Sequence, residues 1–317
     1  MTYLQLAGGV IYLLMGGDLL VRGAVALARK AQVSPMIVAL TIVAFGTSLP
    51  ELVVAIQAAL TGYPGIVLGN VVGSNIANVM LVGGATALIH PLPSGASDLR
   101  RNAMIMIGVS VLFLGISIPG SLHRLAGLLL AGGLIVVLTG TAREASRIHK
   151  RTDSTTPIEW VLGLPSQRRM ITVFILAGLV GLPLGARLVV DAAVDIATQF
   201  GMSTQVVGLT VVAISTSLPE LATTVVAAWQ RRTDLVMGTM IGSNIFNIVG
   251  IMAVAAIVSP TAILVPDKFL FVDLPLMLGA SVVLTAFVWL ERPIRRWHGG
   301  ALVAAYAVYI ASLFVDI

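Results

Sequence analysis

Apolar runs long enough to cross a lipid bilayer occupy most of this chain. A membrane-spanning helix needs about 20 predominantly apolar residues, and 57% of the 317 residues are hydrophobic. Only 10% are charged, whereas soluble domains carry about 25%. The composition therefore predicts an all-α polytopic membrane protein.

Dividing the chain by span length predicts ten transmembrane helices. They cover about residues 5–28, 34–61, 65–89, 102–118, 122–141, 170–198, 203–229, 235–258, 269–290 and 298–315. The gaps on one side hold fifteen Lys and Arg residues, and those on the other side hold only Arg124 and Lys268. Because basic loops stay in the cytoplasm, we expect a multi-pass protein of the cell (inner) membrane with both termini outside.

Composition also excludes several kinds of site. There is no cysteine and there are only four histidines, so thiolate chemistry is excluded and a histidine metal site is disfavoured. The net charge of +5 does not indicate nucleic-acid binding, because the basic residues lie in short gaps where they act as topology signals. The first apolar run lacks the basic region of a cleavable signal, so we expect it to be retained.

The chain contains an internal repeat at an offset of 169 residues. Thr41–Leu52 matches Thr210–Leu221 at nine of twelve positions, and residues 69–78 match 238–247 at six of ten. Each half has five spans, so the second half must enter the membrane from the opposite side. We expect a first five-helix repeat (1–141), a cytoplasmic linker (142–169) and a second, inverted repeat (170–317). Inverted repeats with a central ion site are a recurrent transporter architecture.

Glu51 and Glu220 occupy matching positions in the repeated phrase Thr-Ser-Leu-Pro-Glu-Leu. An acidic residue at mid-membrane costs roughly 2.5–3.5 kcal/mol and is normally kept beside water, an ion or a partner. No Lys or Arg lies within a helical turn of either one. Both could be structural acids bonded to backbone, but their duplication favours a bound cation.

Proline precedes each glutamate and should interrupt its helix. Pro50 and Pro219 remove a backbone donor and clash with the carbonyl four residues back, so we expect breaks near Gly46 and Ser215. Freed carbonyls are tolerated in a membrane only where they are buried or line a polar cavity. The nearby hydroxyls complete an oxygen-rich site, and they belong to Thr47, Ser48, Thr216 and Ser217.

The second repeated phrase adds further oxygens. Ser74 and Asn78 are four residues apart and share a helix face, as do Ser243 and Asn247. For the two asparagines, hydrogen bonding between helices is the alternative role. Small-xxx-small glycines, which permit close helix approach, occur at Gly69, Gly73, Gly238 and Gly242.

An all-oxygen site selects hard cations. Ca²⁺ takes six to eight oxygens in flexible geometry, whereas Mg²⁺ usually keeps several waters and softer metals prefer sulfur or imidazole. Two carboxylates would neutralise one Ca²⁺ or two Na⁺. This balance suggests that the two ions occupy the same region in turn.

The paired phrases Thr-Ser-Leu-Pro-Glu and Gly-Ser-Asn-Ile resemble the two alpha repeats of the calcium/cation antiporter superfamily, in its prokaryotic sodium/calcium exchanger branch. The resemblance implies that discontinuous helices 2, 3, 7 and 8 form the ion-binding core and that helices 1 and 6 slide across it. It implies central ligands in Glu51 and Glu220. Further carbonyl or hydroxyl ligands would come from Ala44, Thr47, Ser48, Ser74, Ala213, Thr216, Ser217 and Ser243.

The chain departs from parts of the superfamily. Some members carry an acid at the position of Asn247, and potassium-dependent exchangers resemble those. Here Asn78 and Asn247 are both neutral, which argues against a potassium requirement. The Gly-Asn-Ala-type phrase of proton/calcium members is absent, and the linker of under thirty residues leaves no room for the regulatory domains of animal exchangers.

We therefore predict a secondary antiporter that exports Ca²⁺ against Na⁺ entry. The expected partners are these two ions and the lipid bilayer, with no cofactor, nucleic acid or obligatory protein partner. A proton/calcium antiporter is the main alternative and a passive cation channel is a weaker one. An integral membrane enzyme is weaker still, because no nucleophile, base and orienting group cluster by sequence.

Two further pairs of charges lie inside predicted spans. Asp18 and Arg22 are four residues apart in the first span, and Arg187 and Asp191 repeat the spacing with the signs exchanged. A gating role is one interpretation. An i,i+4 ion pair that stabilises and orients each helix is the favoured one.

Overall fold

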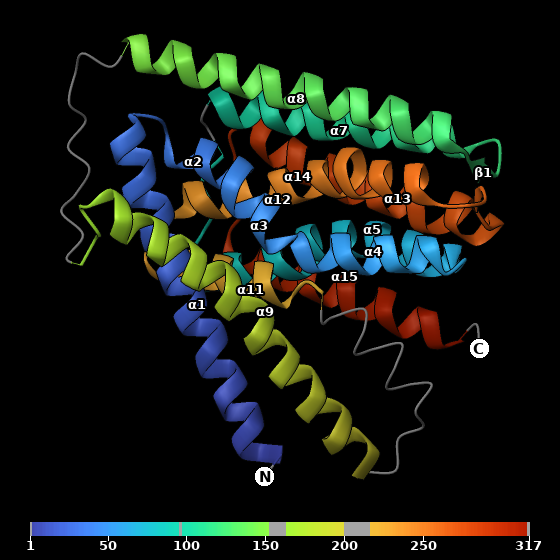
Figure 1. Cartoon of the computed structure of the whole chain (residues 1–317), viewed down its shortest axis with the longest axis horizontal. Helices are drawn as coiled ribbons and strands as arrows, with labels where there is room; N and C mark the ends of the chain where they lie inside the picture. Colours follow the sequence, from blue (N-terminus) through green and yellow to red (C-terminus); the bar gives the residue numbers. More distant parts are fainter. Residues whose placement is uncertain (1, 95–96, 152–162, 200–215, 316–317) are drawn as a thin grey trace.

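The computed structural model describes residues 2–94, 97–151, 163–199 and 216–315. Within these ranges the chain is almost entirely helical (Figure 1). The extended structure there is a short antiparallel ladder of β1 (Ser121–Leu122) with β2 (Ile263–Leu264), and an isolated bridge between Leu92 and Ile294. The prediction of an all-α protein is confirmed.

The first half of the chain contains five helical rods, some of them made of several segments. They are α1 (Thr2–Ala31); α2 (Pro35–Val38), η1 (Ala39–Val43), α3 (Ala44–Thr47) and α4 (Leu49–Leu60); α5 (Pro64–Ala77), η2 (Asn78–Val82) and α6 (Gly83–Ile89); α7 (Ser97–Ser117); and α8 (Arg124–Arg151). The segments η1 and η2 are π-helical. Proline stands in the first turn of α2, α4 and α5, where its missing amide proton costs nothing.

The second half repeats this layout. It contains α9 (Arg168–Gln199); α11 (Leu218–Trp229); α12 (Thr233–Phe246), η3 (Asn247–Met252) and α13 (Ala253–Val258); η4 (Phe269–Asp273) and α14 (Leu274–Trp289); and α15 (Arg296–Val315). The π-helical segments η2 and η3 begin at Asn78 and Asn247, which are equivalent positions of the two repeats.

The predicted spans agree with these helices. Seven described helices are long and apolar enough to cross a membrane, or eight when the bent pair Pro35–Thr47 and Leu49–Leu60 counts as one span. Helices α11 and α15 lie where the remaining two spans are predicted. The polar stretch after residue 141 differs from expectation, because α8 continues to Arg151 through a segment rich in good helix formers.

Spans three and eight are interrupted in a different way from span two. Each runs as one 26-residue helix, Pro64–Ile89 and Thr233–Val258, and the expected discontinuity takes the form of a π-helical segment in its middle. Neither helix has a proline beyond its first turn, so nothing removes an interior backbone donor. Single π-helical turns inside α-helices are frequent at functional sites.

Helices α1 and α9 form a pair that crosses one side of the molecule (Figure 1). Along α1, Gly9, Gly16 and Gly23 contact Val189, Leu182 and Ile175 of α9 in turn. The order shows that the two helices run antiparallel, as an inverted repeat requires. A Cβ added at Gly9 would lie 2.8 Å from a Val189 methyl carbon, so the glycines allow close helix approach.

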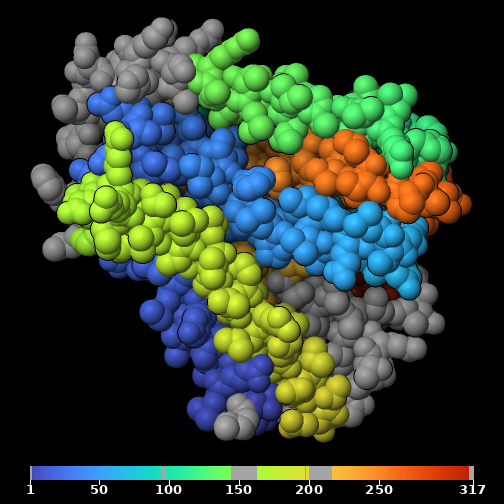
Figure 2. All heavy atoms as spheres, in the orientation of Figure 1, coloured from blue at the N-terminus to red at the C-terminus, as the bar shows by residue number. Residues whose placement is uncertain are grey.

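In the rest of the molecule, helices of one half pack against helices of the other. Helix α12 of the second half packs against α2, η1 and α3 of the first, and α5 packs against η3. Helices α7 and α8 lie along the edge opposite the lower part of α1 (Figure 1). In the space-filling view α9 crosses the visible face (Figure 2), and its Val173, Leu176 and Val180 side chains are more than half exposed, as expected of a helix that faces lipid.

Candidate cation site

The helix break of the first repeat lies at Ser48, between α3 and α4. Ser48 leaves the helical region with φ −87° and ψ 8°, and the two parts of the span meet at 45°. The break is two residues later than the expected position at Gly46. The Ser48 amide still donates to the Ala44 carbonyl at 3.1 Å, so α3 keeps its last turn and the chain turns immediately before Pro50.

The second repeat has the same local geometry where it is described. Ser217 has φ −87° and ψ 1°, and Pro219 lies in the first turn of α11. The break predicted near Ser215 lies outside the described residues, as does Ala213, whose role is implied by the family resemblance. The matching dihedral angles at Ser48 and Ser217 show that the repeated phrase folds in the same way twice.

Glu51 and Glu220 lie in the first turns of α4 and α11, where the helix dipole favours negative charge. Their residues are only 1% and 2% exposed, and the two carboxylates are near enough to repel each other. Glu220 Oε1 accepts a hydrogen bond from Ser48 Oγ at 2.9 Å. No Lys or Arg of the described chain forms an ion pair with either glutamate.

Hydroxyl groups of both repeats contact one another and the Glu220 carboxylate. Ser74 Oγ lies 3.5 Å from Thr216 Oγ1, which joins α5 to the start of α11. Thr47 and Ser243 face the Glu220 carboxylate. Thr47 Oγ1 also donates to the Ala44 carbonyl at 3.3 Å, so two hydrogen bonds already engage the carbonyl that the resemblance assigns to cation binding.

Asn78 and Asn247 form hydrogen bonds between helices, which is one of the two roles considered from sequence. Asn78 Nδ2 donates to Asn244 Oδ1 at 3.1 Å, and Asn247 Nδ2 donates to Asn75 Oδ1 at 3.2 Å. The NH₂ ends of the two amides therefore bond the two repeats together. Their carbonyl oxygens are buried and accept no hydrogen bond from the described residues.

The most informative feature of the site is a group of buried oxygens without hydrogen-bond partners. Nine buried side-chain N or O atoms of the described residues lack a partner. Six of them are oxygens of predicted site residues: Glu51 Oε2, Glu220 Oε2, Ser217 Oγ, Ser243 Oγ, Asn78 Oδ1 and Asn247 Oδ1. A buried polar atom without a partner costs about 1–3 kcal/mol. A bound cation would remove this cost for the oxygens that it contacts.

The donor set determines which cation fits. Every unpartnered atom of the site is oxygen, which suits hard cations such as Ca²⁺ and Na⁺. No group of three or more His, Cys, Asp or Glu side chains lies together in the described part of the chain. The site therefore combines two carboxyl groups with neutral hydroxyl and amide oxygens.

Sequence reasoning missed three asparagines at the site. Asn70 Nδ2 donates to the Glu51 carbonyl at 2.9 Å, and its equivalent in the second repeat is Thr239, so no repeat pattern identifies it. Asn75 and Asn244 stand in the repeated Gly-Ser-Asn-Ile phrase. Their recurrence at the repeat offset was the signal that could have identified them.

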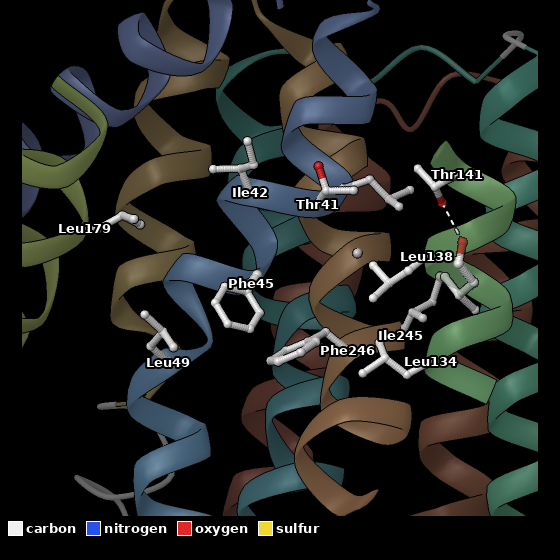
Figure 3. A pocket seen from close by; sticks show the side chains of 13 residues that line it. Thr41, Ile42, Phe45, Leu49, Leu134, Leu138, Thr141, Leu179, Ile245 and Phe246 are labelled. Atoms are coloured by element: carbon white, nitrogen blue, oxygen red, sulfur yellow. Dashed lines mark hydrogen bonds between the residues drawn. The ribbon is translucent and has the colours of Figure 1, made fainter. Parts of the chain in front are cut away.

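A separate cavity of about 380 Å³ lies beside the core, between α8, α9, α12 and the first part of span two (Figure 3). Its lining is nearly all apolar, with Phe45, Leu134, Leu179 and Phe246 among the side chains that surround it. It offers no oxygen cluster for an ion. The rings of Phe45 and Phe246 meet edge to face with centroids 4.9 Å apart.

The charged pairs of α1 and α9 form the predicted i,i+4 contacts. Arg22 Nε lies 2.8 Å from Asp18 Oδ2, and Arg187 Nε lies 3.8 Å from Asp191 Oδ2. Asp18 also accepts a 2.7 Å hydrogen bond from Gln230 at the end of α11. The first pair thus connects α1 to the core, whereas the Arg187 and Asp191 side chains are more than half exposed.

Inverted helical repeats, broken spans and buried acidic residues at their crossing define a membrane transporter of the secondary type. The family model described as sodium/calcium exchanger protein matches residues 1–142 and 170–315. The chain belongs to this family.

Relatives of known name match over nearly the whole chain. The putative antiporter CaxA of Alkalimonas amylolytica is 35% identical over 310 residues, which cover 96% of each protein. The sodium/calcium exchanger MaX1 of Methanosarcina acetivorans is 32% identical over 99% of this chain and 98% of its own length. A solved structure of the sodium-calcium exchanger NCX_Mj, soaked with zero Na⁺ and Ca²⁺, superposes with a TM-score of 0.84 at 31% identity and covers 98% of both chains.

Proposed function

We propose that this protein exchanges Na⁺ for Ca²⁺ across the cell membrane by alternating access, and that Glu51 and Glu220 hold the transported ion. The observation that carries the proposal is the set of six buried, unpartnered oxygens in residues of the two repeated phrases, which includes one oxygen of each glutamate. Membership of the sodium/calcium exchanger family and the names of MaX1 and NCX_Mj support the choice of ions.

Charge balance explains why Ca²⁺ and Na⁺ would occupy the site alternately. Two buried carboxylates carry a charge of −2, which one Ca²⁺ or two Na⁺ neutralise. Leaving the site empty or overfilling it would bury an uncompensated charge, which is costly in a membrane. The same residues would thus release one ion as the other enters, which makes exchange more favourable than uncoupled leakage.

Helix α12 packs closely against the first part of span two. Cβ atoms at Gly238 and Gly242 would lie 2.8 Å and 2.6 Å from backbone oxygens of Met36 and Leu40. These glycines let the two repeats approach closely beside the proposed site.

We infer an orientation from the basic loops. Both termini would lie outside and the segment 142–169 would lie in the cytoplasm between the repeats 1–141 and 170–317. The 29–34 and 230–234 connections would then be cytoplasmic. Sodium entry would drive Ca²⁺ export, and each net charge moved would add about 2.3 kcal/mol per 100 mV of membrane potential.

The test is ⁴⁵Ca²⁺ uptake into proteoliposomes that contain Na⁺, K⁺ or a proton gradient. Uptake that requires internal Na⁺ and is abolished in Glu220→Gln supports the proposal. Uptake driven by the proton gradient without Na⁺ would assign the chain to proton/calcium exchange. Flux that collapses the Ca²⁺ gradient with no counter-ion would indicate a channel. Asp191→Asn, which changes an exposed acid on α9, serves as the matched control.

A further inference from the structure

Four asparagines form a symmetric arrangement where the two repeats cross. Asn75 and Asn78 belong to α5 and the start of η2, and Asn244 and Asn247 occupy the equivalent positions of the second repeat. Each of the four residues is 1% exposed. Asn78 donates to Asn244 and Asn247 donates to Asn75, so the two hydrogen bonds are related by the repeat.

The outer pair is held by methionines of the flanking helices. Asn75 Nδ2 lies 3.5 Å from Met277 Sδ on α14, and Asn244 Nδ2 lies 3.6 Å from Met106 Sδ on α7. A thioether sulfur is a weak acceptor and donates nothing. It therefore accommodates the NH₂ end of an amide better than the carbonyl end. This contact directs the oxygens of Asn75 and Asn244 towards the inner pair.

The orientation of the outer amides fixes that of the inner ones. An amide presents a donor end and an acceptor end. Because Asn75 and Asn244 present oxygen, Asn247 and Asn78 must turn their NH₂ groups towards them. The carbonyl oxygens of Asn78 and Asn247 then remain buried and without partners.

We propose that Asn75 and Asn244 are positioning residues that make Asn78 and Asn247 present oxygen, rather than NH₂, to the transported cation. This inference rests on the proposed function. An amide turned the other way would bring the positive end of its dipole to the site and repel Ca²⁺ and Na⁺. Asn75 and Asn244, together with the methionine sulfurs that orient them, would thus affect cation affinity without contacting the ion.

The test is Asn244→Leu, which keeps a similar volume but removes the oxygen that accepts from Asn78. We expect the concentrations of Na⁺ and Ca²⁺ that give half-maximal exchange to rise at least tenfold, with a much smaller change in maximal rate. Asn244→Gln retains an amide oxygen without adding charge and should restore part of the affinity. Ser110→Ala is the control, because this buried hydroxyl bonds only the Met106 carbonyl of its own helix.

Met106→Leu provides a second variant, which leaves all four asparagines unchanged. Exchange of Met for Leu conserves volume and is usually tolerated, but it removes the sulfur that orients Asn244. A two- to fivefold rise in the same half-maximal concentrations is expected. Unchanged cation affinity in Asn244→Leu and Met106→Leu, with normal exchange by the wild type, overturns the positioning role alone. A wild type without Na⁺- or Ca²⁺-dependent flux overturns the proposed function as well.

Discussion

Replacing Gly242 with alanine is predicted to destabilise the protein more than the same change at Gly108, an exposed glycine inside α7. A Cβ at Gly242 would lie 2.6 Å from the Leu40 carbonyl oxygen and 2.8 Å from Ala44 Cβ. Backbone has to shift to relieve these contacts. At Gly108 no described atom lies within 4 Å of the added carbon.

The size of the difference follows from two contributions. Overpacking a tight contact costs about 1–3 kcal/mol. Replacing a mid-helix glycine with alanine gains about 1 kcal/mol of helix propensity, and this gain cancels because both glycines lie inside helices. Gly242→Ala should therefore be less stable than Gly108→Ala by about 1–3 kcal/mol. At about 2–4 °C per kcal/mol, the midpoint of thermal unfolding should differ by several degrees.

The assay is thermal unfolding of the purified proteins in detergent, followed by the fraction that stays monodisperse in size-exclusion chromatography. Gly108→Ala serves as the matched comparison, because it is the same substitution inside a helix without the close contacts. Equal losses at Gly108 and Gly242, or a larger loss at Gly108, would refute the argument that Gly242 is tightly packed.

Further predictions concern the ion pair of α1 and the effect of pH. Gln230→Ala removes the 2.7 Å hydrogen bond to Asp18 and should lower the unfolding midpoint by about 2–4 °C, as loss of about 1 kcal/mol implies. Asp191→Asn should cause no measurable change, because exposed ion pairs contribute little. Acidification should slow Ca²⁺ transport, because protons compete with the ion for Glu51 and Glu220; a rate that rises as the pH falls would contradict this.

The fold and the two central acids could be predicted because their signals are local and repeated. Hydropathy and basic loops locate the spans, and Pro50 with Pro219 predicts the breaks before Glu51 and Glu220. Ser48 and Ser217 have nearly the same dihedral angles, which shows that the repeated phrase determines this local geometry. The position of the break was wrong by two residues, because the last turn of α3 keeps its backbone bond.

Other features depend on tertiary packing and are not encoded locally. Gly242 packs tightly against the Leu40 carbonyl and the Ala44 side chain. This contact could not be predicted from the repeated phrase, because it depends on how the first repeat is placed against the second. The π-helical form of spans three and eight likewise has no proline to indicate it. The bonds between Asn75 and Asn247 required the relative placement of the two halves.

The most direct test of the central claim is equilibrium binding of ⁴⁵Ca²⁺ to the purified protein. We predict that the wild type binds about one Ca²⁺ per chain, since one ion balances the two carboxylates, and that Na⁺ displaces it. Glu51→Gln and Glu220→Gln should each lose this binding while Asp191→Asn retains it. Folded Glu51→Gln and Glu220→Gln proteins that bind Ca²⁺ like the wild type would contradict the assignment of the ion to these two glutamates.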